Sequence, residues 1–133
     1  MTDGEIQIRV RYAETDRMGL LHHANYLVFF EQARTELLRA VGATYKDMED
    51  QGYLLVLTKA EVKYRWPAHY DDVLTIKTHV ERVTSVRIDH TYAVTCDGRL
   101  VAEGSTTLAC VDRTGRPQAL PDFLRGDLTK PQG

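Results

Sequence analysis

Hydrophobic and polar positions alternate with a period of two over most of the chain and with a helical period over one long stretch. Near the start, Ile6, Ile8 and Val10 alternate with polar residues, which predicts a strand. From residue 23 or 24 to Val41, apolar residues recur every three or four positions, which predicts a helix. The apolar arc is wide, so we expect this helix to be enclosed rather than laid on a surface. Gly42 is placed to end it.

After this helix the pattern is almost entirely that of strands. A short helix or turn is expected over 45–51, strands over 53–64, 73–83, 86–96 and 100–110, a short helix over 122–128 and a loose tail over 129–133. Asp97-Gly98 is a strong two-residue hairpin signal. One long apolar helix and about five strands predict a single α+β domain over residues 1–133, with an antiparallel sheet curled around the helix.

Composition and charge narrow the function. The chain has 133 residues and a net charge of −2, so it has no broad basic surface for nucleic acid. Cys96 and Cys110 have neither disulfide-scaffold nor zinc-site spacing. Residues 1–5 do not resemble a signal peptide, and the longest apolar runs, 26–30 and 53–57, are too short to cross a bilayer. We therefore expect a cytoplasmic protein.

The candidate chemistry lies between the first strand and the long helix. Tyr12, Asp16 and His23 place three protic side chains in one short span that leads into a helix N-terminus. A helix start presents unpaired N–H groups, so a carboxylate beside it can act on a carbonyl whose oxygen those groups hold. The same residues also have a local explanation: Asp16 caps a turn, Tyr12 finishes a strand and His23 is half-buried. Spacing alone leaves both interpretations open.

Several motifs in order resemble one family. The segments are YAETDRMG at 12–19, HANY at 23–26, FEQAR at 30–34, AHYDDVL at 68–74, and TGRP at 114–117 followed by Leu120-Pro121. Together they resemble the hotdog-fold acyl-CoA thioesterases, in particular the 4-hydroxybenzoyl-CoA thioesterase family and its Tol–Pal-associated branch. The resemblance covers nearly the whole chain, and the order and spacing of the segments are more specific than any one of them.

The resemblance implies a hotdog fold, in which a five-stranded antiparallel sheet wraps one long helix, and paired subunits that share a continuous sheet. It assigns the catalytic carboxylate to Asp16, either as nucleophile or as general base. It also implies that Tyr12 and the side chain of His23 act with Asp16. The backbone N–H at or beside His23 would polarise the thioester carbonyl. His22 stands where an aromatic residue is more usual, and we interpret it as a residue that shapes the pocket.

The substrate contacts expected on this basis are Gly19, Tyr26 and Phe30 for the acyl end, and Arg82, Thr84 and Ser85 for coenzyme A. The acyl chain would enter the seam between helix and sheet near Tyr26 and Phe30. Coenzyme A enters as part of the substrate, and neither a separate cofactor nor a metal is expected. We expect a homodimer, because the long hairpin strands leave exposed sheet edges, and a homotetramer by resemblance.

Other polar residues have simpler explanations. Glu31 and Arg34 lie three apart on the helix and can pair with each other or cap polar groups. His90 sits on the apolar face of a strand, which is typical of a hydrogen-bonded core histidine. Basic residues alternate over 59–65, which is typical of a solvated strand face. His69 and His79 are expected at the surface.

Three functions fit these residues to different degrees. The first is hydrolysis of an acyl-CoA to the acid and free coenzyme A. The second is non-catalytic binding of acyl-CoA or an acyl carrier on the same scaffold, which the presence of Asp16 and Gly19 disfavours. The third, a hotdog dehydratase, would require a differently placed histidine, because His23 precedes most of the helix and Glu31 lacks a helical His partner. The sequence therefore favours the thioesterase, with its acyl group unspecified.

Overall fold

The computed structural model of the protein describes residues 2–129. Its elements in chain order are β1 (Asp3–Arg9), a 3-10 turn (Tyr12–Glu14), α1 (Asn25–Ala40), α2 (Tyr45–Asp50), β2 (Leu54–Tyr64), β3 (Val73–Val83), β4 (Arg87–Cys96), β5 (Arg99–Val111) and α3 (Asp122–Thr129). The expected elements are therefore all present, with ends that differ by at most two residues except in β1, which begins at Asp3, three residues before Ile6. Thr129 ends α3 rather than beginning a tail, and 130–133 lie outside the described residues.

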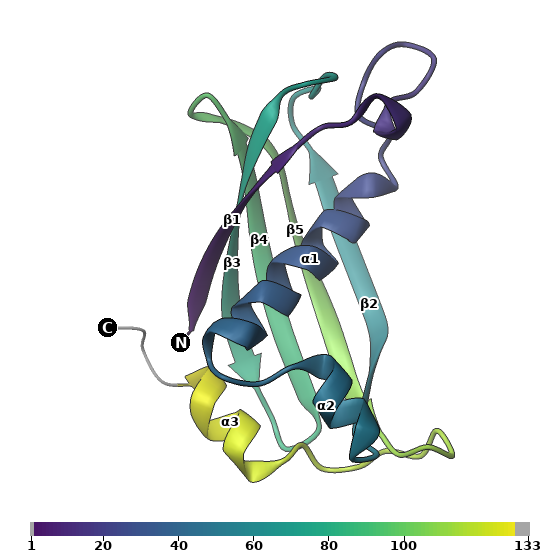
Figure 1. Ribbon diagram of the computed structural model, residues 1–133, viewed down its shortest axis with the longest axis vertical. Helices are drawn as coiled ribbons and strands as arrows, with labels where there is room; N and C mark the ends of the chain where they lie inside the picture. The colour runs from purple at the N-terminus through teal and green to yellow at the C-terminus, as the bar shows by residue number, and fades with distance from the viewer. Residues whose placement is uncertain (1, 130–133) are drawn as a thin grey trace.

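The strands form one antiparallel sheet in the order β1-β3-β4-β5-β2. Because β1 and β2 occupy opposite edges, the segment between them must cross the sheet, and α1 makes that crossing (Figure 1). The sheet curls around α1 (Figure 1). The α+β prediction is confirmed, and this architecture is the hotdog fold.

The core lies between α1 and the inner face of the sheet. The ring of Phe30 stacks on the ring of Tyr92, with centroids 4.1 Å apart and planes 6° apart. This contact needs the glycine at position 104, because a Cβ there would stand 2.6 Å from both the Phe30 ring and the carbonyl oxygen of Glu61. A residue without a side chain thus lets helix and sheet approach closely.

The apolar arc of α1 is only partly covered. Tyr26, Phe30 and Leu37 are among its buried residues, but Leu27 and Val28 remain 37% and 49% exposed. The expectation that the helix is enclosed is therefore wrong for one side of it within this chain. That side faces β2. Leu27 lies one helical turn before Glu31, and Glu31 lines a cleft between α1 and β2.

Both ends of α1 follow local rules. Gly42 has a φ of 92°, the left-handed conformation that ends a helix, so its predicted role is confirmed. At the other end the first helical residue is Asn25, because the backbone of residues 22–24 is occupied by a turn. The helix start is therefore one or two residues later than the pattern indicates.

His90 is buried on the inner face of β4, as its place in the strand indicates. Its Nδ1 atom has no hydrogen-bond partner among the described residues, so the expectation of a hydrogen-bonded core histidine does not hold for that atom. Burial, together with the nearby charge of Arg34, lowers the pKa of His90 to about 3. The ring is therefore neutral at pH 7 and packs as part of the core.

Candidate active site

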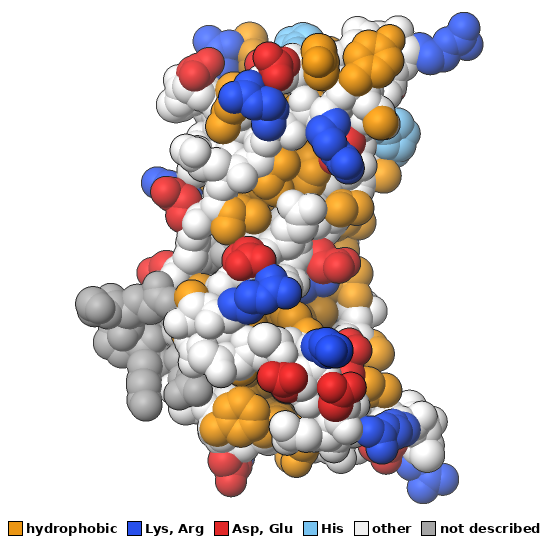
Figure 2. Space-filling view, in the orientation of Figure 1, with side chains coloured by type: hydrophobic (Ala, Val, Ile, Leu, Met, Phe, Trp, Pro, Cys, Tyr) orange, Lys and Arg blue, Asp and Glu red, His pale blue; other side chains and the backbone are white. Residues whose placement is uncertain are grey.

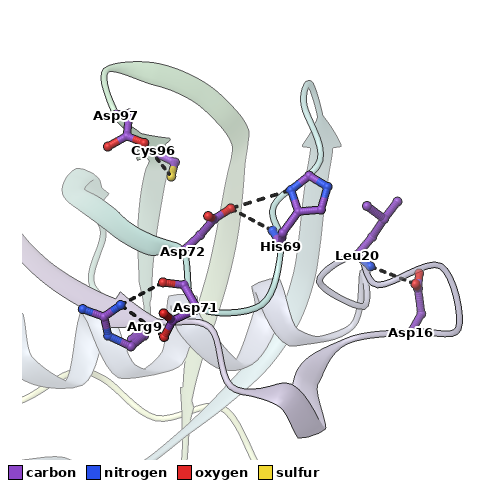
Figure 3. Close-up of polar contacts among 8 residues, drawn as sticks. All are labelled: Arg9, Asp16, Leu20, His69, Asp71, Asp72, Cys96 and Asp97. Atoms are coloured by element: carbon purple, nitrogen blue, oxygen red, sulfur yellow. Dashed lines mark hydrogen bonds and ion pairs between the residues drawn. The ribbon is translucent and has the colours of Figure 1, made fainter.

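Asp16 is held by a tight turn. Its backbone N–H donates to the carbonyl of Leu20 (2.8 Å), and its Oδ1 accepts from the backbone N–H groups of Met18 (2.9 Å) and Leu20 (3.1 Å; Figure 3). Gly19 closes the turn with a φ of 78°. The turn therefore orients the carboxylate through one oxygen. The other oxygen, Oδ2, accepts no hydrogen bond from residues 2–129.

Hydrogen bonds tie the loop that carries Asp16 to the segment after β2 and to the start of α1. The N–H of Leu21 donates to the carbonyl of Ala68 (2.8 Å), in the segment that follows β2. The carbonyl of Glu14 accepts from the N–H of His22 (2.8 Å) and from the side-chain amide of Asn25 (2.9 Å). These bonds fix the turn relative to the start of α1. Glu14 and Asn25 belong to the quoted motifs, but no pattern in the sequence marks them for this positioning role.

The start of α1 leaves one backbone donor open. The N–H of Ala24 is taken by Nδ1 of His22 (3.2 Å), and the N–H of Asn25 by the carbonyl of His22 (3.0 Å). The N–H of His23 has no acceptor among the described residues. His22 therefore acts as a local cap. Its ring also stacks on that of His23, with centroids 4.1 Å apart.

A surface cavity of about 340 Å³ brings these groups together. Its lining residues include Asp16, Leu20, His23, Tyr26, Tyr64 and Trp66. They come from the loop, from α1, and from the end of β2 with the segment after it. Asp16 and His23, two of the three expected catalytic residues, thus border one hollow beside the helix start.

Tyr64 is a cavity residue that sequence reasoning missed. Its hydroxyl donates to the carbonyl of His23 (3.2 Å), and its ring meets the ring of Tyr26 edge-on with centroids 5.3 Å apart. Burial and the neighbouring Tyr64 raise the pKa of Tyr26 to about 12, so its hydroxyl stays protonated at neutral pH. No local signal marks Tyr64, because only the sheet register brings it to the helix start.

The remaining acyl-end and catalytic candidates lie elsewhere. Tyr12 is 77% exposed, packs edge-on against Tyr70 and does not border the cavity. Gly19 shapes the turn and does not border it either. Phe30 is fully buried in the core. Roles for these three in catalysis or substrate contact therefore stay predictions, and this chain alone does not bring them to Asp16.

The coenzyme A candidates lie at the other end of the sheet. Val73 begins β3 beside the loop, and Arg82 lies near the far end of this eleven-residue strand, roughly 30 Å away. Figure 1 places the β3–β4 turn beside α3, opposite the loop that carries Asp16. Within the turn, Thr84 Oγ1 accepts from the backbone N–H of Arg87 (3.0 Å), and the carbonyl of Ser85 accepts from Leu120 (2.8 Å). One chain therefore cannot join this turn to its own Asp16.

Cationic side chains stand near the cavity instead. Arg65 borders it and pairs with Glu103 (2.6 Å), which lowers the pKa of that carboxyl group. The guanidinium of Arg99 lies over the ring of Trp66, 4.1 Å from its centroid. These positive groups beside an exposed aromatic ring give the cavity a rim suited to a phosphate-bearing ligand.

The arrangement suits attack on an activated carbonyl. Asp16 and His23 line the same cavity, and among residues 2–129 neither Oδ2 of Asp16 nor the backbone N–H of His23 has a hydrogen-bond partner. A carboxylate and a backbone donor are the groups needed to deliver a nucleophile and hold the carbonyl oxygen. No group of three His, Cys, Asp or Glu side chains within residues 2–129 is placed to hold a metal ion. Across the same residues, no helix is long and apolar enough to cross a membrane.

The fold and this cavity define a hotdog-fold protein of the thioesterase class. A family model described as the Thioesterase-like superfamily matches residues 10–128, and the chain belongs to that superfamily. The resemblance found in the motifs is thereby confirmed.

Two curated relatives are similar over most of their length. Acyl-CoA thioester hydrolase YbgC of Escherichia coli is 34% identical over 119 residues, 88% of this chain and 89% of that protein. Acyl-CoA thioesterase YbgC of Haemophilus influenzae is 34% identical over 120 residues, 89% of this chain and 88% of that protein.

A solved structure agrees in fold and sequence. The crystal structure of DHNA-CoA thioesterase from Staphylococcus aureus aligns with a TM-score of 0.89 and 34% identity, and covers 95% of this chain and 86% of that one. Relatives at this level of identity thus share the whole domain rather than a motif.

Proposed function

We propose that the protein hydrolyses acyl-CoA thioesters to the free acid and coenzyme A. The observation that carries this is that Asp16 and His23 line one cavity, and that the N–H of His23 has no acceptor among the described residues. The names of the relatives support the same activity. A thioester has little amide-like resonance and a good thiolate leaving group, so a carboxylate and one oriented N–H suffice for its hydrolysis.

In this mechanism the thioester carbonyl oxygen accepts from the N–H of His23, and Asp16 acts from the other side of the carbonyl carbon. Asp16 has two possible roles, as a base that takes a proton from water or as a nucleophile that forms an anhydride later hydrolysed by water. In both, the carbon–sulfur bond breaks and the thiolate of coenzyme A leaves. As a base, Asp16 passes the proton taken from water to that thiolate; as a nucleophile, Asp16 is regenerated when water hydrolyses the anhydride, and the thiolate takes its proton from solvent. Tyr64 supports the donor by holding the carbonyl of His23.

The direct test is release of free thiol from short, long and aromatic acyl-CoAs by the unaltered protein. We expect multiple turnovers on at least one class. Coenzyme A binding without turnover on any member of the panel would contradict the proposal and favour the alternative, a non-catalytic acyl-CoA or acyl-carrier-binding protein. Cytoplasmic location stays a prediction alongside this activity.

The working unit in this proposal is a homodimer joined through β2. This strand lies at a sheet edge, extends over eleven residues, about 36 Å, and has no partner on its outer side within the described chain. Val56 and Leu57 are 41% and 48% exposed on it, and Leu27 and Val28 extend the apolar surface onto α1. Figure 2 shows hydrophobic side chains gathered along this margin. A long apolar edge of this kind favours pairing with a second copy.

The charges on β2 are compatible with one register in particular. A two-fold axis through Ala60, perpendicular to the sheet, pairs the strands antiparallel and keeps both α1 helices on one face. Lys59 of each copy then lies opposite Glu61 of the other, so opposite charges face each other twice. The same axis brings the β3–β4 turn of the partner to the Asp16 end, where Arg82, Thr84 and Ser85 could meet coenzyme A.

A charge exchange tests this interface. Glu61→Lys should weaken dimerisation about tenfold at low salt, because each attractive pair becomes repulsive. The double variant Lys59→Glu with Glu61→Lys should restore it, since the opposite charges are exchanged. Sedimentation velocity over a concentration series measures both. Equal association of the natural protein and Glu61→Lys would show that these strands do not pair in this register.

A further inference from the structure

A second cavity lies away from Asp16, in the cleft between α1, α2 and the beginning of β2. Its volume is about 390 Å³, and Glu31, Arg34, Tyr45, Tyr53 and Leu55 are among the residues that line it. Two tyrosine rings and two leucines line part of it, and polar and charged groups line the rest. Of the three charged groups, Glu31 and Arg34 stand one turn apart on α1, and Glu49 lies on α2. This cavity is not part of the site described above.

The charged groups of this cavity are not paired with each other. No ion pair joins Glu31 to Arg34, and neither makes an ion pair with another described residue. The half-buried guanidinium of Arg34 instead interacts with the hydroxyl of Tyr92. The expectation that Glu31 and Arg34 pair is therefore wrong. A donor and an acceptor thus remain available to a ligand.

This combination matches a neutral hydroxyl group. A guanidinium can donate to the hydroxyl oxygen while a carboxylate accepts its hydrogen. A ligand carboxylate fits less well, because Glu31 and Glu49 give the cavity two negative charges against the one positive charge of Arg34. The tyrosine rings and leucines in the lining suit a hydrocarbon chain that ends in that hydroxyl.

An acyl group bound at Asp16 cannot reach this cavity within the same chain. Tyr26 and Arg34 are eight residues apart on α1, about 12 Å along the helix. The interior between them is filled by buried side chains, including Phe30, and the two cavities share no lining residue. The seam that the sequence indicated for the acyl chain is therefore closed inside one subunit.

The paired subunits bring the cavities together. Tyr64, which borders the Asp16 cavity, is four residues after Ala60 in β2. Leu55, which borders the second cavity, is five residues before Ala60, and the bulge between Leu57 and Lys59 accounts for the extra residue. About a two-fold axis at Ala60, Tyr64 of one subunit lies level with Leu55 of the other. Each Asp16 cavity then opens toward the second cavity of its partner.

We propose that Arg34 and Glu31 of the partner subunit bind the far end of the acyl group and select acyl chains that end in a hydroxyl. This inference rests on the proposed hydrolysis and on the β2 dimer. It assigns a specificity role to two residues that lie far from the reacting carbon. Each active site is then incomplete without its partner.

The first test compares kcat/KM for ω-hydroxyacyl-CoAs of increasing chain length with that for their unsubstituted counterparts. We expect a preference of about tenfold or more for the hydroxylated member at one length, since a hydrogen bond to a charged group is worth about 1.5–3 kcal/mol. Arg34→Met and Glu31→Leu should each abolish most of that preference. Arg39→Met, an exposed arginine on the same helix, should keep it.

Two outcomes would overturn the inference while leaving hydrolysis intact. One is turnover of unsubstituted acyl-CoAs with no preference for a hydroxyl at any chain length. The other is a stronger preference for acyl groups that end in a carboxylate. Because Glu31 is exposed, its variant keeps the test decisive if Arg34→Met does not fold.

The second test shows whether the residues act across the dimer. A heterodimer of one Asp16→Asn chain and one Arg34→Met chain, each with its own affinity tag, is purified through both tags. If Arg34 acts in the partner's site, one of the two sites combines native Asp16 with native Arg34, and the hydroxyl preference returns. If Arg34 acts within its own chain, the only site with Asp16 lacks Arg34. The preference then stays lost, and the inference fails.

Discussion

Replacing Asp16 by Asn is expected to lower kcat on the best acyl-CoA about a thousandfold with little change in KM, because a positioned carboxylate base or nucleophile contributes on that scale. The substitution is conservative for structure. An amide oxygen at Oδ1 can still accept from Met18 and Leu20, so the turn that holds the side chain persists. Thiol release under saturating substrate measures the change, and thermal unfolding checks that the fold is retained.

A matched aspartate on a neighbouring loop serves as the control. Asp71 is exposed, pairs with Arg9 and does not border the Asp16 cavity (Figure 3). Its φ of 73° is tolerated by asparagine. Asp71→Asn should leave kcat within about twofold, since exposed ion pairs contribute little. Near-normal turnover by Asp16→Asn would remove this carboxylate from the chemistry and redirect attention to His23.

Gly104→Ala should destabilise the fold by about 2–3 kcal/mol and lower the melting temperature by roughly 10 °C, the range for inserting a carbon into a packed core of this size. A new Cβ would stand 2.6 Å from the carbonyl oxygen of Glu61 and from the ring of Phe30. The first neighbour is the backbone of β2 and the second is stacked on Tyr92, so neither can move freely. Calorimetry of the purified variant measures the loss.

Gly126 provides the comparison, because it lies in α3 and a Cβ at this position would meet nothing within 4 Å among the described residues. Gly126→Ala should stabilise the protein by about 0.5–1 kcal/mol through helix propensity. A melting temperature of Gly104→Ala equal to that of the natural protein would show that α1 and the sheet can separate enough to admit a methyl group. The close stacking of Phe30 on Tyr92 would then not prevent a side chain at position 104.

Exposed apolar side chains lie on one side of the chain, on β2 and α1. The edge of β2 and the adjoining face of α1 border both cavities. In the proposed dimer this margin would be covered, and the acyl group would lie between subunits rather than inside one of them. Specificity for the acyl group would then depend on a different subunit from the one that supplies Asp16.

Local patterns are enough to predict the elements and the local part of the site. Alternation and helical spacing give five strands and α1 to within one or two residues, except at the start of β1, because burial on one face imposes those periods. Asp16, Gly19 and His23 lie close along the chain, so the turn and the helix start that hold them depend on short-range geometry. Gly42 and the Asp97-Gly98 hairpin follow from the same local rules, and both aspartate and glycine of that hairpin have positive φ.

Contacts between distant segments bring further residues to the site. Tyr64 and Trp66 reach the cavity because β2 pairs with β5 at the edge opposite β1. Phe30 does not line the cavity, since the glycine at position 104 leaves room for its ring in the core. The β3–β4 turn lies at the far end because a strand of eleven residues separates it from the loop. Sequence periodicity gives the face on which a side chain lies, whereas strand order and length decide what it meets there.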